Sequence, residues 1–311
     1  MGGPPTLRPG PSRREAMLGL LALGACAPGA RPEGNVFAAG QPAAILLLAL
    51  APERLLGWPR RPGRRALAML GAGADKPELG ALASGGRPAS LEAVAALRPA
   101  LVLDYGDLSP AYRALAARVE RRVGAPYRLI DGGLRRTPEA LVEAGALLGV
   151  EARAGQLAEA ARRALAGWAK PAESGPSFYY ARADGLETGF RGSLATEVLE
   201  GAGWSNVAAG GTGIGRVGRE QVAAWDPEVL VTLDERFARG ALRDPFWSRR
   251  RGGGLRRVLL VPETPFGWID RPPSINRLLG SAWAGGGAQA DDLARLFWGV
   301  RGEVGAPRWL A

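Results

Sequence analysis

A long helical stretch near the middle of the chain separates two regions in which short apolar strands alternate with helices. The stretch covers residues 138–170, with Thr137 as its predicted cap and Pro138 at the first helical position. Gly149 and Gly155 are expected to divide it into a shorter and a longer helix. It is longer than a crossover between two parallel strands requires, so we interpret it as a rigid connector between two lobes.

The region before this connector has the pattern of a parallel sheet covered by helices. Ser90 is predicted to cap a short helix that ends at Leu97, before Arg98 and Pro99. Strands are expected at 35–39, 54–58, 100–103 and 127–130, and further helices at 43–50 and 110–123. Strands that alternate with helices indicate a parallel sheet that is buried on both faces.

The region after the connector resumes this alternation. Strands are expected at 177–181, 186–189, 229–233 and 258–261, and helices at 194–201, 221–225, 277–283 and 290–298. No internal repeat is visible. A chain of 311 residues exceeds the size at which a single core usually divides, so length and pattern together predict an α/β protein with two lobes.

The charge of the chain is strongly basic but dispersed. The net charge is +10, from 40 basic and 30 acidic residues, and Lys76 and Lys170 are the only lysines. Nucleic-acid binders usually gather their basic residues on one element. Here the arginine runs are scattered among acidic residues, at 121–122, 135–136, 249–251 and 256–257. We interpret them as solvated surface and expect no nucleic-acid partner.

The missing residue types exclude several chemistries. The chain has no histidine and one cysteine, Cys26, so it holds no Ser-His-Asp triad, Cys-His pair, HExxH zinc site, histidine-rich metal cage or internal disulfide. Paired carboxylates remain, and an exported carboxylate-dependent hydrolase would use Asp104 with Asp107, or Asp234 with Glu235. Neither pair has the context of a general acid and base. We therefore expect no catalytic residue, no metal site, no cofactor and no enzyme activity.

The N-terminal residues are typical of an export signal. Ser12, Arg13 and Arg14 precede a short apolar run, Met17–Ala25, as in a secretory signal peptide of the twin-arginine type. Met17 stands where phenylalanine is commoner, which leaves the Sec route open. The run is shorter than the roughly 20 residues that span a bilayer, and no later segment qualifies.

The end of this run, Leu23 to Cys26, resembles the lipobox of bacterial lipoproteins. That resemblance implies acylation of Cys26, which would become the mature N-terminus; cleavage after a nearby alanine is the alternative. We expect a signal peptide over residues 1–26 and a linker over 27–34. The mature protein is then expected in the periplasm, or otherwise outside the cytoplasm, with a lipid tether to a membrane.

Four later segments carry a second resemblance. Ser90–Leu103 and Arg219–Val231 each have an early glutamate on a helix, then a proline and an apolar strand; Glu200–Ala208 and Phe266–Gly280 are the other two. In this order they resemble the periplasmic binding proteins with a helical backbone, which carry ferric siderophores, haem and cobalamin to ABC importers. The resemblance covers about residues 35–298. Ala100 stands where the family usually has an acid.

The resemblance implies a fold and a role. The fold is two Rossmann-like α/β lobes, over residues 35–137 and 171–311, joined by a single long α-helix within the connecting helices 138–170, with the ligand cleft between the lobes. The role is the substrate-binding component of an ABC importer, expected to be a monomer. It would capture an iron complex of the ferric-siderophore type and deliver it to a permease dimer with its ATPase. Cobalamin, haem or an oxyanion such as molybdate are the alternative ligands.

The resemblance also implies two docking residues. In this family one glutamate per lobe binds arginines of the permease, and matching by motif gives Glu92 and Glu220. Two acids at opposite ends of a rigid body would orient it on a basic platform. The alternative is that both acids are there because helix N-termini favour negative charge.

The ligand is expected at the carboxyl ends of both sheets, where α/β proteins leave a crevice. Aromatic rings offer flat apolar area there, and arginine pairs with carboxylate, catecholate or hydroxamate oxygens. The candidate residues on loops reaching this place are Gln41, Tyr105, Tyr180, Arg182, Arg191, Arg216 and Trp268. A haem ligand would be held by a tyrosine such as Tyr105 or Tyr180. Asp270–Pro273 is expected to form a turn between a strand and a helix.

Overall fold

The computed structural model describes residues 1–3, 34–83, 87–168, 175–286 and 290–310. Residues 32–311 form the folded unit, and residues 1–31 are a separate one. Nearly all of the predicted signal peptide and linker, including Cys26, lies outside the described residues, so export and acylation stay predictions.

The first lobe is built on a three-stranded parallel sheet in the order β1 (Val36–Ala38), β2 (Leu101–Gly106), β3 (Tyr127–Asp131). The central strand β2 is buried from Leu101 to Tyr105, because Leu101–Leu103 are apolar and the Asp104 carboxylate finds a hydrogen-bond partner inside the fold. The helices of the first lobe are α1 (Gln41–Leu50), α2 (Arg64–Met69), α3 (Leu91–Ala96) and α4 (Pro110–Val123), and short 3₁₀ turns lie at Pro52–Arg54 and Ala72–Ala74. Ser90 caps α3 as predicted, since its Oγ accepts a hydrogen bond from the Ala93 amide at 3.0 Å.

The second lobe is built on a five-stranded sheet in the order β10-β9-β8-β4-β6, in which only the edge strand β10 is antiparallel to its neighbour. The strands are β4 (Ser177–Tyr180), β6 (Ser205–Asn206), β8 (Val229–Thr232), β9 (Arg257–Leu260) and β10 (Arg308–Leu310). A separate antiparallel pair joins β5 (Glu187–Gly189) to β7 (Ile214–Arg216). The helices are α7 (Glu197–Gly201), α8 (Arg219–Trp225), α9 (Glu235–Ala241), α10 (Pro245–Ser248), α11 (Arg277–Ala284) and α12 (Ala290–Trp298).

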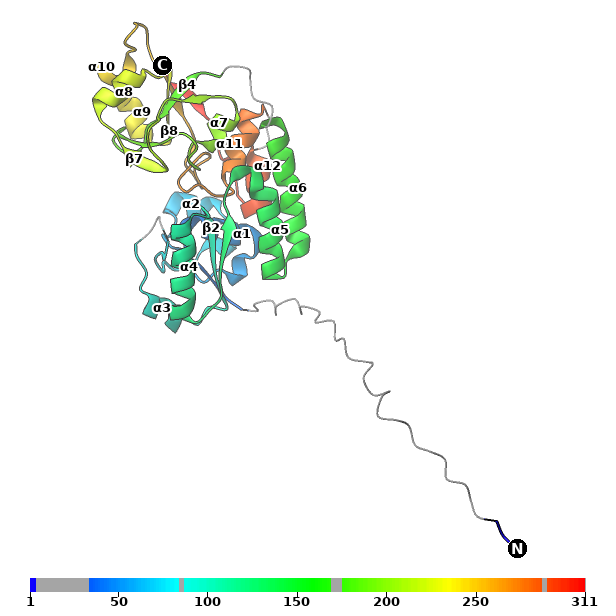
Figure 1. The fold of residues 1–311 in the computed structure, drawn as a ribbon. Coiled ribbons are helices and arrows are strands. Elements are labelled where there is room, and N and C mark those ends of the chain that lie inside the picture. The colour runs from blue at the N-terminus through cyan, green and yellow to red at the C-terminus, as the bar shows by residue number, and fades with distance from the viewer. Residues whose placement is uncertain (4–33, 84–86, 169–174, 287–289, 311) are drawn as a thin grey trace. The chain divides into compact units, whose positions relative to one another are not determined.

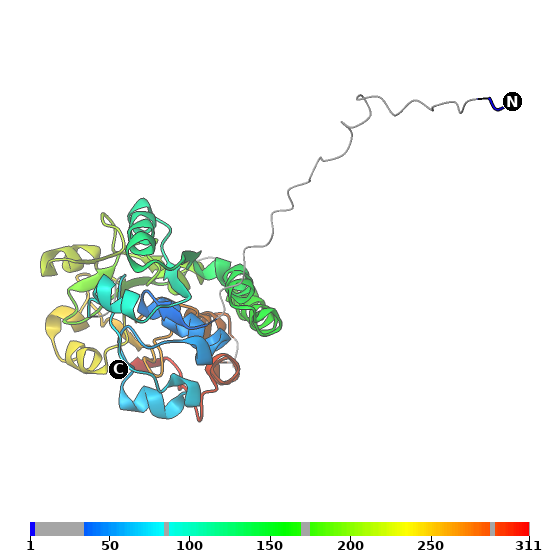
Figure 2. The same ribbon diagram turned by 90° about the horizontal axis from the view of Figure 1, so that it is seen from below.

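The connector consists of two helices, α5 (Thr137–Leu148) and the 18-residue α6 (Glu151–Trp168), which follow a 3₁₀ turn at Leu134–Arg136. Gly149 separates them in the left-handed conformation, with φ of 70°. Gly155 was predicted to divide the stretch as well, and that is wrong because α6 passes through it. Figure 1 shows both green helices along one side of the folded unit, and Figure 2 shows them nearly end-on.

The two lobes share one hydrophobic core. The largest cluster of buried apolar side chains takes members from both sheets. The chain returns to the first lobe at α12, which packs against α1 and whose Trp298 indole donates to the Ile45 carbonyl at 3.2 Å, before β10 joins the second-lobe sheet. The predicted fold class, two α/β lobes joined by a long helix, is confirmed. The predicted lobe boundaries stay a prediction, and α12 crosses from the second predicted lobe to the first.

Several local expectations were incomplete. The strand predicted at 54–58 is wrong: this segment begins in a 3₁₀ turn and forms only single bridges, from Leu55 to Val36 and from Trp58 to Glu78. Thr137 is the first residue of α5, and Arg136 is its cap. The elements that the sequence did not indicate, α2, α9, α10, β6, β7 and β10, have two to seven residues each and are too short to show a period.

No helix in the described ranges has both the length and the apolar content that crossing a membrane requires.

Two glycines on the connector allow a paired test of its packing. A Cβ on Gly145 of α5 would lie 2.1 Å from the Ala154 Cβ of α6, whereas a Cβ on Gly155 meets no atom within 4 Å. Glycine in a helix costs roughly 0.5–1 kcal/mol relative to alanine. We therefore expect Gly155→Ala to raise the free energy of unfolding and Gly145→Ala to lower it, as measured by urea denaturation. Equal stabilisation by both would contradict the close contact of α5 and α6.

Candidate functional site

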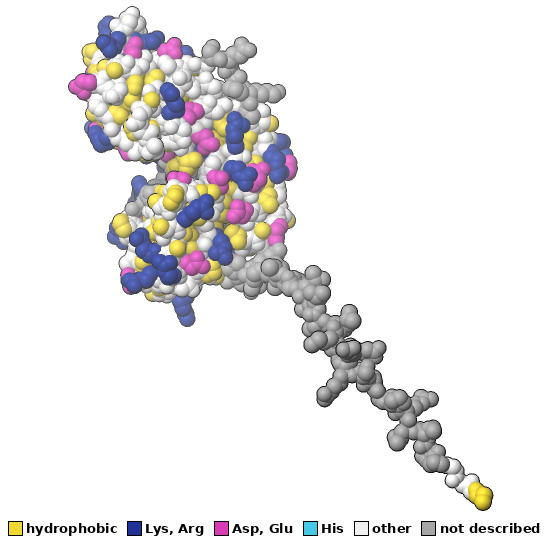
Figure 3. Space-filling view, in the orientation of Figure 1, with side chains coloured by type: hydrophobic (Ala, Val, Ile, Leu, Met, Phe, Trp, Pro, Cys, Tyr) yellow, Lys and Arg dark blue, Asp and Glu magenta, His cyan; other side chains and the backbone are white. Residues whose placement is uncertain are grey.

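A cavity of about 1370 Å³ lies between the two lobes, at the carboxyl ends of their strands. Figure 3 shows the surface hollowed between the lobes. The first lobe contributes the segments that follow β1, β2 and β3, together with Arg60–Ala66. The second lobe contributes the segments after β4 and β9 and the loop before α7. The predicted position of the ligand crevice therefore matches the position of this cavity.

The first-lobe wall holds a buried carboxylate. Asp104 is 4% exposed, and its carboxylate accepts hydrogen bonds from the Tyr127 hydroxyl at 2.7 Å and from the Tyr105 amide at 2.9 Å. Burial raises the pKa of Asp104, and the bond from Tyr127 opposes that effect. Next to it, Gln41 lines the cavity and its Oε1 accepts from the Arg60 amide at 3.0 Å. This wall offers hydrogen-bonding groups whose positions are already fixed.

The second-lobe wall holds a network around Asp270. The Asp270 carboxylate, 3% exposed in its side chain, accepts from the Tyr180 hydroxyl at 2.9 Å and lies 3.1 Å from Nε of Arg182. Arg182 also lies 3.5 Å from Glu187. A second pair on this wall joins Arg271 to Glu263 at 3.2 Å. Both arginines of this wall are thus held by carboxylates that themselves line the cavity.

An arginine beneath the cavity ties the two walls together. Arg277 at the start of α11 is fully buried and forms an ion pair with Glu197 of α7 at 2.7 Å. Its guanidinium also donates to the carbonyl of Gly132 in the first lobe and to the carbonyl of Leu194 in the second, the latter at 3.0 Å. Glu197 in turn accepts from the Leu134 amide at 3.0 Å. One ion pair therefore bonds to backbone on both sides of the cleft.

The structure brings three of the seven predicted ligand residues to the cavity, namely Gln41, Tyr105 and Arg182. Tyr180 and Trp268 are fully buried and do not line it; Tyr180 acts on the wall through Asp270. Arg191 donates to the Asn206 carbonyl at 2.9 Å and Arg216 pairs with Asp184 at 2.7 Å; neither arginine lines the cavity. Ligand contact stays a prediction for all seven.

The two predicted docking residues lie on different lobes. Glu92 is in the first turn of α3 and Glu220 is in the first turn of α8, and both side chains are exposed. The position fits permease docking and fits the helix-dipole explanation equally well.

The sequence did not identify most of the charged lining. Asp270–Pro273 was expected to be a turn after a strand; it instead belongs to an irregular loop between β9 and α11 and lines the cavity. Arg60, Arg61 and Arg65 line it from the first lobe. With 38 arginines in the chain, no local pattern distinguishes these from surface residues.

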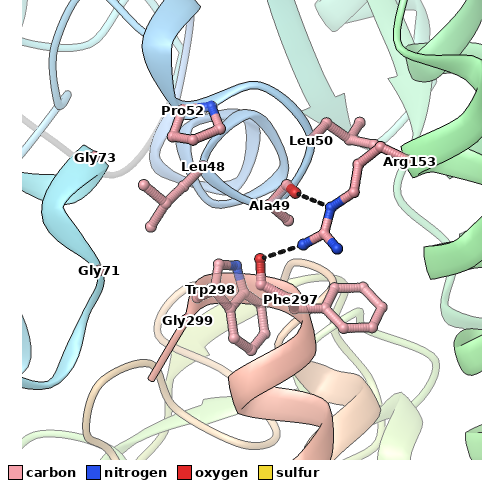
Figure 4. Close-up of a pocket in the computed structure, with 10 residues that line it drawn as sticks. All are labelled: Leu48, Ala49, Leu50, Pro52, Gly71, Gly73, Arg153, Phe297, Trp298 and Gly299. Carbon is pink, nitrogen blue, oxygen red and sulfur yellow. Dashed lines mark hydrogen bonds between the residues drawn. The ribbon is translucent and has the colours of Figure 1, made fainter. Parts of the chain in front are cut away.

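A smaller cavity of about 320 Å³ lies apart from the cleft, between the end of α1 and the end of α12 (Figure 4). Its one charged lining residue, Arg153, donates to the Ala49 carbonyl at 3.2 Å and to the Leu296 carbonyl. The guanidinium is therefore used to join the two helices. Among the described residues there is also no group of three or more acidic or sulfur ligands placed to hold a metal ion.

Comparison with known proteins establishes the fold. No family model and no curated protein matches the chain. Among solved structures, an ABC transporter solute-binding protein from Sulfurospirillum deleyianum is 24% identical with a TM-score of 0.75, over 88% of this chain and 92% of that one. The molybdate periplasmic binding protein of Haemophilus influenzae, bound to molybdate, is 18% identical with a TM-score of 0.65, over 88% and 95%. A periplasmic haem-binding protein from Roseiflexus is 19% identical with a TM-score of 0.56, over 81% and 99%. This chain has the two-lobe fold of the periplasmic solute-binding proteins.

Removing the negative partner of Arg277 should destabilise the fold strongly. Glu197→Gln leaves the buried Arg277 guanidinium without its counter-charge. Loss of one partner costs about 3–5 kcal/mol in fully buried pairs, and the loss here should be smaller because the Glu197 side chain is 29% exposed. Glu159→Gln removes a carboxylate from an exposed pair with Arg162, and that change should cost less than about 1 kcal/mol. Urea denaturation of both variants measures the difference. A loss no greater for Glu197→Gln than for Glu159→Gln would show that the pair does not join the lobes.

Proposed function

We propose that this chain, which has the fold of the periplasmic solute-binding proteins, is the substrate-binding component of an ABC importer. In this role it captures an iron complex of the ferric-siderophore type outside the cytoplasmic membrane and delivers it to the permease dimer and its ATPase. The observation that carries the proposal is the cavity of about 1370 Å³ between the lobes. Cavities that hold ordinary small ligands measure roughly 300–1,000 Å³, so this one fits a bulky ligand.

The chemistry of the lining fits binding without reaction. The chain has no histidine, and its one cysteine precedes the folded unit, so the nucleophile–base pairs that depend on histidine are excluded. Asp104 and Asp107 both line the cavity, as the rival hydrolase would require. Asp104, however, is already bonded to Tyr127 and to the Tyr105 amide, and Asp107 accepts from the Ser109 amide at 2.9 Å. Both acids thus have structural partners, which favours a binding role.

Haem is the second candidate because one similar structure is a haem-binding protein. Tyrosine is one of the residues that hold haem iron, and Tyr105 and Tyr112 line the cavity. Tyr105 is only 1% exposed, and Tyr180 is buried with its hydroxyl on Asp270. Neither of these two tyrosines presents an accessible oxygen to a ligand as it stands, which favours the siderophore complex; Tyr112, which is partly exposed at the cavity, is the tyrosine that a haem ligand would have to use. Molybdate, the ligand of another similar structure, is far smaller than the cavity.

Export and tethering belong to the same proposal. A binding protein that delivers solute to an importer works outside the cytoplasmic membrane, and the sequence before the folded unit is typical of a lipoprotein signal. Acylation of Cys26 would keep the monomeric protein near its permease. Replacement of Cys26 by serine would then release the protein from membranes.

Blocking the cleft tests the binding site directly. A Cβ on the cavity-lining Gly106 meets no atom within 4 Å, so the side chain of Gly106→Trp is expected to occupy the cavity without disturbing the backbone. We expect this change to weaken binding of a ferric siderophore by at least about 100-fold in isothermal titration. Gly240→Trp on α9, also with an open Cβ but away from the cavity, is the control. Unchanged affinity in Gly106→Trp would place the ligand elsewhere.

Docking on the permease can be tested separately from binding of the ligand. Reversal of both exposed acids, Glu92→Arg with Glu220→Arg, should stop uptake of the radiolabelled iron complex in cells that carry the cognate permease. Affinity in solution should be unaltered, since neither residue lines the cavity. Normal uptake by the double variant would disprove the docking assignment.

A further inference from the structure

The lining of the large cavity is balanced in charge. It contains five arginines and six carboxylates and no lysine; the residues are Arg60, Arg61, Arg65, Arg182, Arg271, Asp104, Asp107, Asp131, Glu187, Glu263 and Asp270. The chain as a whole carries a net charge of +10, so the cavity does not share the basic character of the rest of the protein. The arginines alone would favour an anionic ligand, and the acids oppose that preference.

The arginines of the lining are mostly paired within the protein. Arg182 lies between Asp270 and Glu187, at 3.1 Å and 3.5 Å, and Arg271 lies 3.2 Å from Glu263. These five residues of the second-lobe wall bring three negative charges against two positive ones. A ligand that is strongly anionic would approach these acids while finding the guanidiniums already engaged.

The first-lobe wall is balanced in a different way. Arg61 pairs with Asp75, outside the lining, at 2.6 Å. Arg65 and Asp107 form no ion pair with another residue of the described ranges, so each leaves one charge, of opposite sign, at the cavity. A ligand with a few separated polar groups would find both a donor and an acceptor here. A ligand with several like charges would find no matching surface.

We propose that the cleft selects its ligand by low net charge: a bulky ferric complex that is neutral or singly positive is bound, and highly anionic complexes are rejected. This inference rests on the proposed function and specifies the class of iron complex. A hydroxamate group carries one negative charge, so three of them neutralise Fe³⁺. A catecholate group carries two, so three of them leave a complex with three negative charges. The balanced lining therefore favours a trihydroxamate over a tricatecholate complex, and disfavours a dianionic oxyanion.

Substitution of Glu263 can change the charge preference of the cavity while the other lining residues stay the same. Its side chain is 49% exposed and forms an ion pair with Arg271. Glu263→Gln removes one negative charge from the lining and leaves the Arg271 guanidinium available to an anionic ligand. Glu235→Gln is the matched control, because Glu235 pairs with Arg239 at 2.7 Å on α9, away from the cavity.

The experiment is isothermal titration of the mature protein and both variants with two probes, a neutral ferric trihydroxamate complex and the trianionic ferric complex of a tricatecholate. We expect the native protein to bind the neutral complex at least about 100-fold more tightly than the trianion. Glu263→Gln should strengthen binding of the trianion by about tenfold and change binding of the neutral complex by a smaller factor, because a lining charge acts more strongly on a trianion than on a neutral ligand. Glu235→Gln should change neither affinity.

Failure of the charge selection and failure of the proposed iron-complex function give different results in this experiment. Tighter binding of the trianion by the native protein would overturn the charge selection and leave the proposed iron-complex function standing. An equal effect of Glu263→Gln on both probes would also overturn it, because the carboxylate would then act on folding or shape alone. Absence of binding by both probes, at protein concentrations that detect micromolar affinity, would remove the proposed function and this inference with it.

Discussion

A buried guanidinium at the junction of the lobes is the constraint on which the cleft depends. Arg277 is withdrawn from water completely, and a lone charge in such a place would be very costly. The cost is offset by Glu197 and by backbone carbonyls from both lobes. The two sheets therefore cannot separate at the base of the cavity without exposing or orphaning this charge.

The shared hydrophobic core and the connector helices also hold the two lobes together. Buried apolar side chains from both lobes form one cluster, α6 packs against α11 and α12, and Ser274 bonds across to the Pro42 carbonyl at 2.7 Å. Large domain closure needs a few residues that change φ and ψ freely, and the 18-residue helix α6 offers none within its span. The structure thus favours a cleft that is formed before the ligand arrives. In such a cleft, selectivity comes from fixed positions of charge and shape, and the balanced ion pairs of the lining provide those positions.

The sequence predicted the parts of the structure that depend on local pattern. Helix α4 has the predicted bounds, 110–123, because Ser109 precedes it, Pro110 occupies its first position and Gly124 follows it. The four segments that resemble the helical-backbone binding proteins also predicted the correct fold when taken together, although no single segment would have been sufficient. The position of the cavity followed from the rule that parallel strands leave a crevice at their carboxyl ends.

The composition of the site was much less predictable. Tyr180 and Trp268 are aromatic residues near the cleft, and their sequence gives no sign that they are buried behind its wall. Arg277 has the same local surroundings as a surface arginine at a helix start, and its burial depends on Glu197, 80 residues away. Glu263 and Arg271 become a pair only through an irregular loop. Contacts of this kind are set by tertiary packing, which neither helical nor strand periodicity records.

The most direct measurement is native mass spectrometry of the protein purified from iron-limited cells that produce it. We predict a complex of one protein with one iron-containing small molecule whose own charge is zero or +1, released when the protein is unfolded by acid. Protein that carries no iron complex under these conditions, or that carries an oxyanion in its place, would contradict the assignment of this cleft to a bulky metal complex.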